Sequence, residues 1–410
     1  MNPGKKLAAA FFLLILLASC SPRLKKQERP APPSPPIRVL LAEIASVDSL
    51  EFSGLYHLQT EEARYAFGAR TPRVYLRVDS SGFRIYNKKR FLQFRTTHRV
   101  SFNPAQSASY IRYRGHKYAG RISLIYKKGK LLLIEQLPLE HYIAGVVPAE
   151  IFTNKKKWFE AVKAQAVCAR TYAYKKIQSR KKAEFDVYGD VRDQAYGGLG
   201  RQTLLGDKAT EQTRGSVLFY KDSLAYTYFH ACDGGASESV ADVWGQKERP
   251  YLTGRQDALG DSFSCAAAPV FRWRQTRSMA QLDSAYAFMF GHGFSDSTVS
   301  DTTRIALSLR VASRTPSGRV KQLELLYGGE KRILSGYAIR RFLAWPLGGY
   351  LPSTLFRLEK KGDKLRIIGG GNGHGVGMCQ YGAMGRSEKG MRFYHILQSY
   401  YPGTHLEKVY

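Results

Sequence analysis

The stretch that decides the fold is YIAGVVPAEIFTNKKKWFEAVKAQAVCARTYAY, residues 142–174. It opens with an apolar run over residues 143–147, and this run leads to a single carboxyl group at Glu150. A short basic loop, Lys155 to Lys157, follows. Burial among apolar residues raises the pKa of a carboxyl group. The surroundings of Glu150 therefore decide how readily this acid keeps its proton.

The second half of the stretch has the periodicity of a helix. From Trp158 to Tyr172, apolar residues recur at spacings of three, four and six to seven, which predicts a helix. Several of its positions are alanine, so neighbouring elements can approach it closely. The same helix carries Gln165 and Arg170, and we expect both side chains to point into a cleft.

The residues by themselves allow two interpretations of Glu150. It can be a surface or helix-capping acid, because acids without a partner are rarely buried. It can also be a general acid, because desolvation beside Val146, Val147 and Ile151 would raise its pKa towards neutrality. The pattern of residues leaves both open.

Three ordered blocks resemble the signature of the stage II sporulation protein D family, which includes the amidase enhancers. The blocks are LPLEHYIAGVVPAE with EAVKAQAVCARTYAY, then YFHACDGGASESVADVWG at 228–245, and then GNGHGVGMCQYGAMG with YYPGT between 371 and 404. The resemblance covers roughly residues 113–410. The best-understood members are lytic transglycosylases that act on peptidoglycan glycan strands. Their catalytic glutamate matches Glu150, so the resemblance implies that Glu150 is the catalytic acid.

The second and third blocks predict further positions in the cleft. A strand over Ala225–Phe229 is expected to deliver His230 to a turn at Gly234 and Gly235, where the backbone could approach a ligand closely. The glycine loop at 373–377 fits neither a dinucleotide-binding nor a phosphate-binding pattern. It is expected to place side chains in the same cleft. With the two polar residues of the helix, the candidate substrate-binding residues are Gln165, Arg170, His230, Gly234, Gly235, His374, Gln380 and Tyr381.

The charge of the chain points to an anionic partner. Its 410 residues, enough for two or three domains, include 63 Lys and Arg but 33 Asp and Glu, for a net charge of +30. Such a surface attracts a polyanion such as nucleic acid, anionic lipid or an anionic cell wall. No zinc-finger, RNA-recognition or basic coiled-coil pattern accompanies the charge, so nucleic acid is not expected as a partner.

The N-terminus predicts export and lipidation. Residues 1–19 have the proportions of a signal peptide, with two lysines before an apolar run that is short for a membrane span. The run ends in Leu-Ala-Ser-Cys, which resembles a bacterial lipobox and predicts a lipid on Cys20; an ordinary signal peptide is the alternative. Ser21 favours the outer membrane, facing the periplasm. Residues 20–36 are a basic, proline-rich tether that could hold the protein on the order of 50 Å from the membrane.

Four further cysteines lie in the predicted exported part, at positions 168, 232, 265 and 379. Cys168, in the alanine-rich helix, is expected to be a buried thiol. Because Cys232 and Cys265 flank one segment, they are the predicted disulfide. A zinc site at His230, Cys232 and Cys265 is the alternative, but zinc needs four ligands or three and a water, so no cofactor is expected.

The expected fold class is α+β, an antiparallel β-rich body with a few packed helices around an open glycan-binding groove. Residues 37–136 alternate like strands on either side of turns and form the N-terminal β-rich region. Residues 137–410 form the catalytic domain. In this domain, helices are expected at Ser278–Phe290 and Tyr337–Leu343, and a further helix from Gln380.

The predicted function is cleavage of the bond between N-acetylmuramic acid and N-acetylglucosamine, with formation of a 1,6-anhydro sugar. This reaction needs one carboxyl group, because the attacking hydroxyl belongs to the substrate, whereas hydrolases use two. Asp233 and Asp242 lie in a segment expected to form the cleft, so hydrolysis with one of them as the second carboxylate is an alternative. Two other hypotheses are a non-catalytic wall-binding protein that stimulates a partner amidase, and a metalloenzyme built around His230 and Cys232.

Overall fold

The computed structural model describes residues 32–59, 64–68, 72–87, 94–96, 99–291 and 307–410. It divides into two units, Met1–Pro33 and Ser34–Tyr410, and the fold described below is that of the second. The predicted signal peptide, the lipidation site Cys20 and most of the tether lie outside the described residues. Among the described residues, no helix is both long and apolar enough to cross a membrane.

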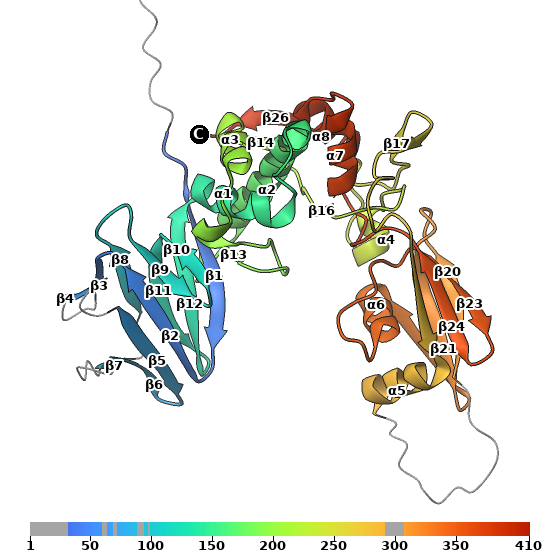
Figure 1. Cartoon of the computed structure of the whole chain (residues 1–410), viewed down its shortest axis with the longest axis horizontal. Coiled ribbons are helices and arrows are strands. Elements are labelled where there is room, and N and C mark those ends of the chain that lie inside the picture. The colour runs from blue at the N-terminus through green and yellow to red at the C-terminus, as the bar shows by residue number, and fades with distance from the viewer. Residues whose placement is uncertain (1–31, 60–63, 69–71, 88–93, 97–98, 292–306) are drawn as a thin grey trace, which may run out of the picture. The chain divides into compact units, whose positions relative to one another are not determined.

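The predicted α+β class is confirmed. The N-terminal part is built from two sheets of mostly antiparallel strands, coloured blue to cyan in Figure 1. The seven-stranded sheet has the order β13(Val187–Tyr188), β1(Pro36–Ile44), β12(Lys130–Pro138), β11(Arg121–Lys127), β8(Val100–Pro104), β3(Tyr56–Gln59) and β4(Arg64–Phe67). The six-stranded sheet has the order β10(His116–Tyr118), β9(Tyr110–Tyr113), β2(Val47–Ser53), β5(Arg73–Asp79), β6(Gly82–Tyr86) and β7(Phe94–Thr96).

The first sheet continues beyond the predicted N-terminal region of residues 37–136. β12 ends at Pro138, and helix α1 begins at the next residue. β13, from the segment after the central helix, pairs in parallel with β1 through Val39 and Val187. The first sheet therefore includes a strand from the segment after α2. It also leads directly into α1, the helix that ends at Glu150.

Five helices form the body that follows. They are α1(Leu139–Glu150), α2(Phe159–Ser179), α3(Leu204–Gln212), α7(Gln380–Glu388) and α8(Phe393–Tyr400), with the 3-10 turns η1(Lys156–Trp158) and η2(Gly198–Arg201). The predicted alanine-rich helix is α2, and twelve of its residues are buried. α2 contacts each of the other four helices, so it is central as expected.

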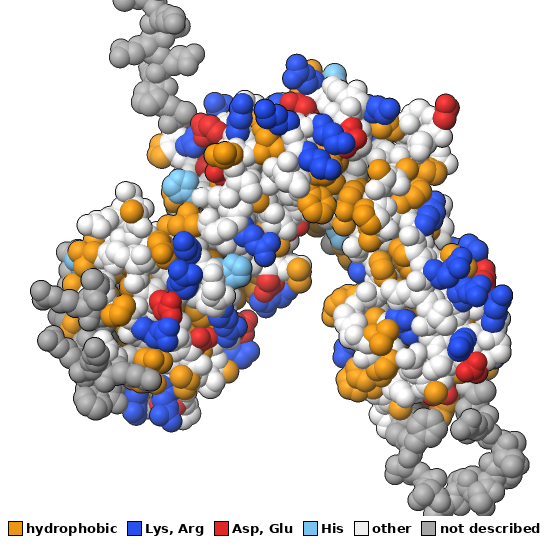
Figure 2. All heavy atoms as spheres, in the orientation of Figure 1, with side chains coloured by type: hydrophobic (Ala, Val, Ile, Leu, Met, Phe, Trp, Pro, Cys, Tyr) orange, Lys and Arg blue, Asp and Glu red, His pale blue; other side chains and the backbone are white. Residues whose placement is uncertain are grey.

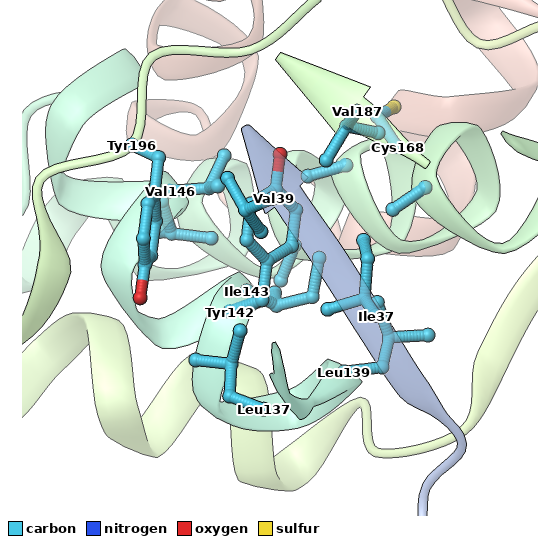
Figure 3. Packing of buried hydrophobic residues seen from close by; sticks show 14 of the residues in the cluster. Ile37, Val39, Leu137, Leu139, Tyr142, Ile143, Val146, Cys168, Val187 and Tyr196 are labelled. Atoms are coloured by element: carbon cyan, nitrogen blue, oxygen red, sulfur yellow. The ribbon is translucent and has the colours of Figure 1, made fainter. Parts of the chain in front are cut away.

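One continuous apolar core joins this helical body to the first sheet. Figure 3 shows Tyr142, Ile143 and Val146 of α1 packed with Ile37 and Val39 of β1. These side chains are almost completely removed from water. Burial of an aliphatic side chain contributes roughly 1.5–3 kcal/mol, so the apolar run before Glu150 is what fixes α1 against the sheet.

Residues 273–367 have a separate hydrophobic core, which includes Leu282, Leu323, Phe342 and Ile367. Its elements are β19(Trp273–Ser278), α5(Met279–Phe290), β20(Ser308–Arg314), β21(Val320–Tyr327), β22(Glu330–Ser335), α6(Gly336–Ala344), β23(Phe356–Lys361) and β24(Lys364–Gly369). The expected helices over 278–290 and 337–343 are α5 and α6. Ser278 and Gln281 form a capping box that sets the start of α5.

The remaining elements are short. They are β14(Ser216–Tyr220), β15(Ser223–Leu224), β16(Phe229–His230), α4(Val240–Trp244), β17(Ala258–Leu259), β18(Ser262–Phe263), β25(Met378–Cys379) and β26(His405–Lys408). The strand expected over Ala225–Phe229 is wrong in extent. Only Phe229 and His230 form a strand, because their partner β25 is itself two residues long.

Candidate active site

Glu150 is the last residue of α1, where Ile151 turns to an extended conformation. It is half-buried, and one carboxylate oxygen, Oε1, accepts a hydrogen bond of 2.6 Å from the Ala195 N–H. Burial raises the pKa of Glu150, and hydrogen bonds from Ala195 and the Gln380 side chain only partly oppose the rise. The negative end of the α1 dipole also disfavours a carboxylate at this position. The site therefore stabilises the protonated form of Glu150 relative to that of an exposed glutamate, and the Ala195 N–H holds its carboxyl group in one orientation.

Two glutamines lie beside this acid. Gln380, the first residue of α7, is buried and contacts Glu150, and its Nε2 lies 3.4 Å from Oε1 of Gln165 on α2. The Nε2 of Gln165 is buried and has no hydrogen-bond partner among the described residues. The structure thus brings the predicted residues Glu150, Gln165 and Gln380 together and leaves the buried Gln165 amide donor without a partner among the described residues.

Three aromatic rings lie next to this group. Phe152 is exposed, and its ring centroid lies 6.0 Å from that of Trp158 and 6.0 Å from that of Tyr381. Tyr381 was a predicted site residue; Phe152 and Trp158 were not. The sequence feature that could have indicated Phe152 is its position, because it is a large apolar residue two positions after Glu150 and just before the basic loop. Such rings present flat apolar faces that suit contact with sugar rings.

Arg170 corrects the prediction of a cleft position. Its side chain is completely buried and forms two hydrogen bonds of 2.8 Å with the carboxylate of Glu140 on α1. It also donates to the carbonyl oxygens of Thr210 and Ser216. Arg170 therefore ties α2 to α1, α3 and β14, and its role is structural.

His230 and His374 lie close together, with ring centroids 5.4 Å apart. Burial lowers the pKa of both imidazoles, well below the usual value for His230 and to about 4 for His374. Both are bonded to the backbone of Val376: His230 Nδ1 lies 3.2 Å from its carbonyl oxygen, and His374 Nδ1 accepts from its N–H at 3.0 Å. Two neutral histidines therefore hold the glycine loop in shape.

Gly234 and Gly235 also differ from the prediction that they approach a ligand. Both have positive φ, +75° and +108°. A Cβ on Gly234 would lie 2.9 Å from backbone atoms of Gly370 and Gly371, and one on Gly235 would meet the Phe263 ring. These glycines are required by close approach to neighbouring parts of the protein.

The predicted Cys232–Cys265 disulfide is not present in the structure, where the four described cysteines are free and buried. Cys379, which was not chosen for the predicted disulfide, lies in the same cluster of sulfur atoms. His230 is not part of that cluster, so the alternative ligand set predicted from the sequence also differs. Cys168 is a buried thiol on α2, as expected.

Glu135, on β12, is a buried acid that the sequence analysis did not consider. Burial raises its pKa to about 7. Its Oε1 accepts from the Gly120 N–H at 2.9 Å and its Oε2 from the Tyr196 hydroxyl at 2.8 Å. Both oxygens are thus engaged. Since Tyr196 follows Ala195, this acid anchors the segment whose N–H contacts Glu150.

The surface agrees with the net charge of +30. Figure 2 shows Lys and Arg side chains spread over the visible face, with fewer Asp and Glu among them. Lys155 and Lys157 extend this charge to the aromatic group, with their Nζ atoms 4.8 Å and 5.9 Å from the centroid of the Trp158 ring.

These features define a class of protein: an α+β fold with one desolvated carboxyl group, polar side chains around it and a basic surface. Comparison with known proteins supplies the family. The model described as "Stage II sporulation protein" matches residues 127–220, and one described as "Domain of unknown function (DUF8618)" matches residues 258–377. The second match includes all of the separate core.

Three relatives show how far the similarity extends. An uncharacterised protein of Brachyspira hyodysenteriae is 30% identical over 292 residues, 71% of this chain and 72% of its own. The amidase enhancer of Bacillus subtilis is 28% identical over 64% of this chain, which spans 40% of the enhancer's length. Stage II sporulation protein D of Bacillus subtilis is 26% identical over 67% of this chain and 76% of its own.

The chain belongs to the stage II sporulation protein D and amidase enhancer family. This membership relates it to the cell wall and places it among proteins of the bacterial cell envelope.

Proposed function

We propose that this chain is a peptidoglycan lytic transglycosylase in which Glu150 is both general acid and general base. The observation that carries the proposal is the environment of Glu150. Burial raises its pKa, the Ala195 N–H fixes one of its oxygens, and the Gln380 side chain contacts it. A protonated carboxyl group near neutral pH is what the first step needs.

In the first step, protonated Glu150 donates its proton to the oxygen that links C1 of N-acetylmuramic acid to N-acetylglucosamine, and the C1–oxygen bond breaks. In the second step, the Glu150 carboxylate takes the proton from the C6 hydroxyl of the same muramic residue. That oxygen bonds to C1 and forms the 1,6-anhydro ring. The carboxyl group is protonated again, so one acid is sufficient.

Hydrolysis by two carboxylates has less support. Asp242 forms an ion pair of 2.9 Å with Lys321. Asp233 is buried, and its Oδ1 accepts from the Cys265 thiol and the Gly235 N–H. Asp242 is thus paired with a lysine, and Asp233 is buried with one oxygen engaged by Cys265 and Gly235, so a one-acid reaction fits the site better.

The second candidate function is a non-catalytic enhancer of a partner cell-wall amidase. The observation that favours it is the similarity to the Bacillus subtilis amidase enhancer. Mass spectrometry of the products from purified peptidoglycan separates the two functions. A transglycosylase acting alone releases anhydromuropeptides, whereas an enhancer releases none but accelerates an added N-acetylmuramoyl-L-alanine amidase.

Lipidation of Cys20 is part of the proposal, because the apolar run that ends in Leu-Ala-Ser-Cys has the form of a lipobox. We expect Cys20→Ala to leave the precursor unprocessed or to release the protein from the membrane fraction, and density-gradient separation of inner and outer membranes should place the wild-type protein in the outer membrane. Ser19→Ala, which keeps the cysteine, is the control. Unchanged processing and membrane association of Cys20→Ala would contradict lipidation.

Binding to the wall should be partly electrostatic, because the chain carries a net charge of +30. The Debye length falls from about 10 Å at 0.1 M salt to about 3 Å at 1 M, so exposed charges lose their reach. We expect retention on purified sacculi to decrease several-fold over this range in a pull-down assay. Retention that does not change with salt would mean that uncharged sugar contacts dominate.

A further inference from the structure

Three buried thiols from distant parts of the sequence meet in one place. Cys232 follows β16, Cys265 follows β18, and Cys379 ends β25 and caps helix α7. Their Sγ atoms all lie within 4.8 Å of one another. A disulfide joins two sulfur atoms and would leave the third as a buried free thiol, so the arrangement needs another explanation.

The spacing of the sulfur atoms suits a tetrahedral metal ion. At a zinc–sulfur distance of about 2.3 Å, two ligands of a tetrahedral ion lie about 3.8 Å apart. One ion could therefore bind all three with small movements of the side chains. Thiolates are soft ligands and select zinc over harder cations such as magnesium or calcium.

The surroundings of Cys379 support a negatively charged sulfur. Its Sγ accepts hydrogen bonds from the Gly382 N–H at 3.2 Å and the Asp233 N–H at 3.4 Å, at the start of helix α7. A helix N-terminus stabilises a thiolate. Cys379 is completely buried, and a buried charge is costly without a partner, so a thiolate at this position requires a nearby cation.

Asp233 offers a fourth ligand. One of its carboxyl oxygens, Oδ2, is buried and has no hydrogen-bond partner among the described residues. Its carboxyl group lies within 4.8 Å of the sulfur atoms of Cys265 and Cys379, but not within that distance of the Cys232 sulfur, so the Asp233 side chain would have to rotate towards Cys232 to complete the ligand set. Asp257 is also near these two sulfurs, but its carboxylate is already engaged by Ser264, Tyr400 and Arg386. Asp233 is thus the better-placed oxygen ligand.

The buried Arg319 offsets part of the charge of such a site. Three thiolates and one carboxylate around a divalent ion have a net charge of −2. The guanidinium of Arg319 is buried, and its Nη2 donates to the Asp233 carbonyl oxygen at 2.8 Å. A buried cation is costly without a nearby negative charge, and the metal site would supply one.

We propose that Cys232, Cys265 and Cys379 bind one zinc ion, with Asp233 as the fourth ligand. The site is structural, because four protein ligands leave no position for water. It joins three segments beside the candidate active site. Cys379 pairs with His230 between β16 and β25 and directly precedes Gln380, which contacts Glu150. The bound ion would fix the start of α7 and so the position of Gln380.

The test is zinc analysis of the full chain, purified under reducing conditions and equilibrated with zinc alone. We expect one zinc per chain in the wild type. Cys232→Ser, Cys265→Ser and Cys379→Ser should each lower zinc affinity by more than about 100-fold, beyond what loss of an outer contact causes. Cys168→Ala is the matched control, because Cys168 is equally buried but lies outside the cluster. Cobalt substitution should give sulfur-to-metal charge-transfer absorption that the three variants lose.

A measurement on the wild type keeps the proposal testable if the variants do not fold. A chelator should lower the unfolding temperature and expose three additional thiols to alkylation, and added zinc should reverse both effects. Absence of zinc together with a mapped disulfide between any two of these cysteines would overturn the proposal, as would zinc that survives all three substitutions. Since the readouts do not involve glycan cleavage, this proposal can fail while Glu150 remains the catalytic acid, and the reverse also holds.

Discussion

Glu150→Gln should produce almost no anhydromuropeptide from purified peptidoglycan. Glutamine keeps the shape of the side chain and can still accept the Ala195 N–H, but it can neither donate the proton nor take it back. General acid–base catalysis contributes about 10²–10⁴-fold, and here both proton transfers depend on one group. Glu211→Gln is the matched control, because Glu211 is an exposed acid on α3. Its turnover should equal that of the wild type.

Folding and binding distinguish loss of chemistry from loss of structure. Burial raises the pKa of Glu150 in the folded state, so ionisation of this group destabilises the fold as pH rises through the unfolded and folded pKa values. At neutral pH, Glu150→Gln should therefore unfold at the same temperature as the wild type or at a higher one, and it should still bind sacculi. Wild-type turnover in this variant would favour the enhancer function instead.

The pH dependence of the wild type gives an independent test of the same group. The first step needs protonated Glu150, so kcat/KM should fall as pH rises above its raised pKa. The midpoint should lie above the usual value for glutamate, about 4.3. A rate that is constant from acidic to alkaline pH would exclude Glu150 as the proton donor.

Arg170→Met should lower the free energy of unfolding more than Glu150→Gln or Arg192→Met does. The substitution leaves the buried carboxylate of Glu140 without its partner, and breaking a buried pair in this way costs about 3–5 kcal/mol. Denaturant unfolding measures the change. The control is Arg192→Met, which removes an exposed pair with Asp190 and should cost no more than about 1 kcal/mol.

The double variant Glu140→Gln/Arg170→Met tests the cause. It removes both charges, so it should recover part of the stability that Arg170→Met loses. Burial alone would raise the pKa of Glu140, but hydrogen bonds and charge from Arg170 lower it. The pair therefore contributes stability above the unfolded pKa of glutamate, and this contribution is lost as pH falls through the folded value. Equal stability of the wild type and Arg170→Met would instead give Arg170 a role outside the core.

Local patterns were sufficient for several helices. The spacing of apolar residues predicted α2, and the helix expected over 278–290 is α5, which begins at a capping box formed by Ser278 and Gln281. These predictions succeed because a helix depends on neighbours three or four positions away and on the residue that caps it. Glu150 was predicted from its apolar approach together with a family resemblance, and the raised pKa follows from burial that the approach suggested.

Gln165 and Arg170 show that local sequence patterns do not predict the surroundings of a polar side chain on a helix. Both are polar residues on one helix, and both were predicted to face a cleft. Five residues advance about 140° around a helix, so one face cannot present both side chains. Both side chains are completely buried, but Gln165 lies beside Gln380, whereas Arg170 lies against Glu140. The partner of each side chain depends on Glu140 and on the chain after residue 200.

The sequence by itself determined the fold class and the central helix and indicated Glu150 as the candidate acid, because these depend on periodicity and on residues near one another in the chain. Only the tertiary structure decided which side chains surround that acid and which cysteines meet. Cys379 lies 147 positions after Cys232, and the short parallel pair of β16 and β25 brings them together. Contacts of this kind are set by packing between distant segments, and no local pattern encodes them.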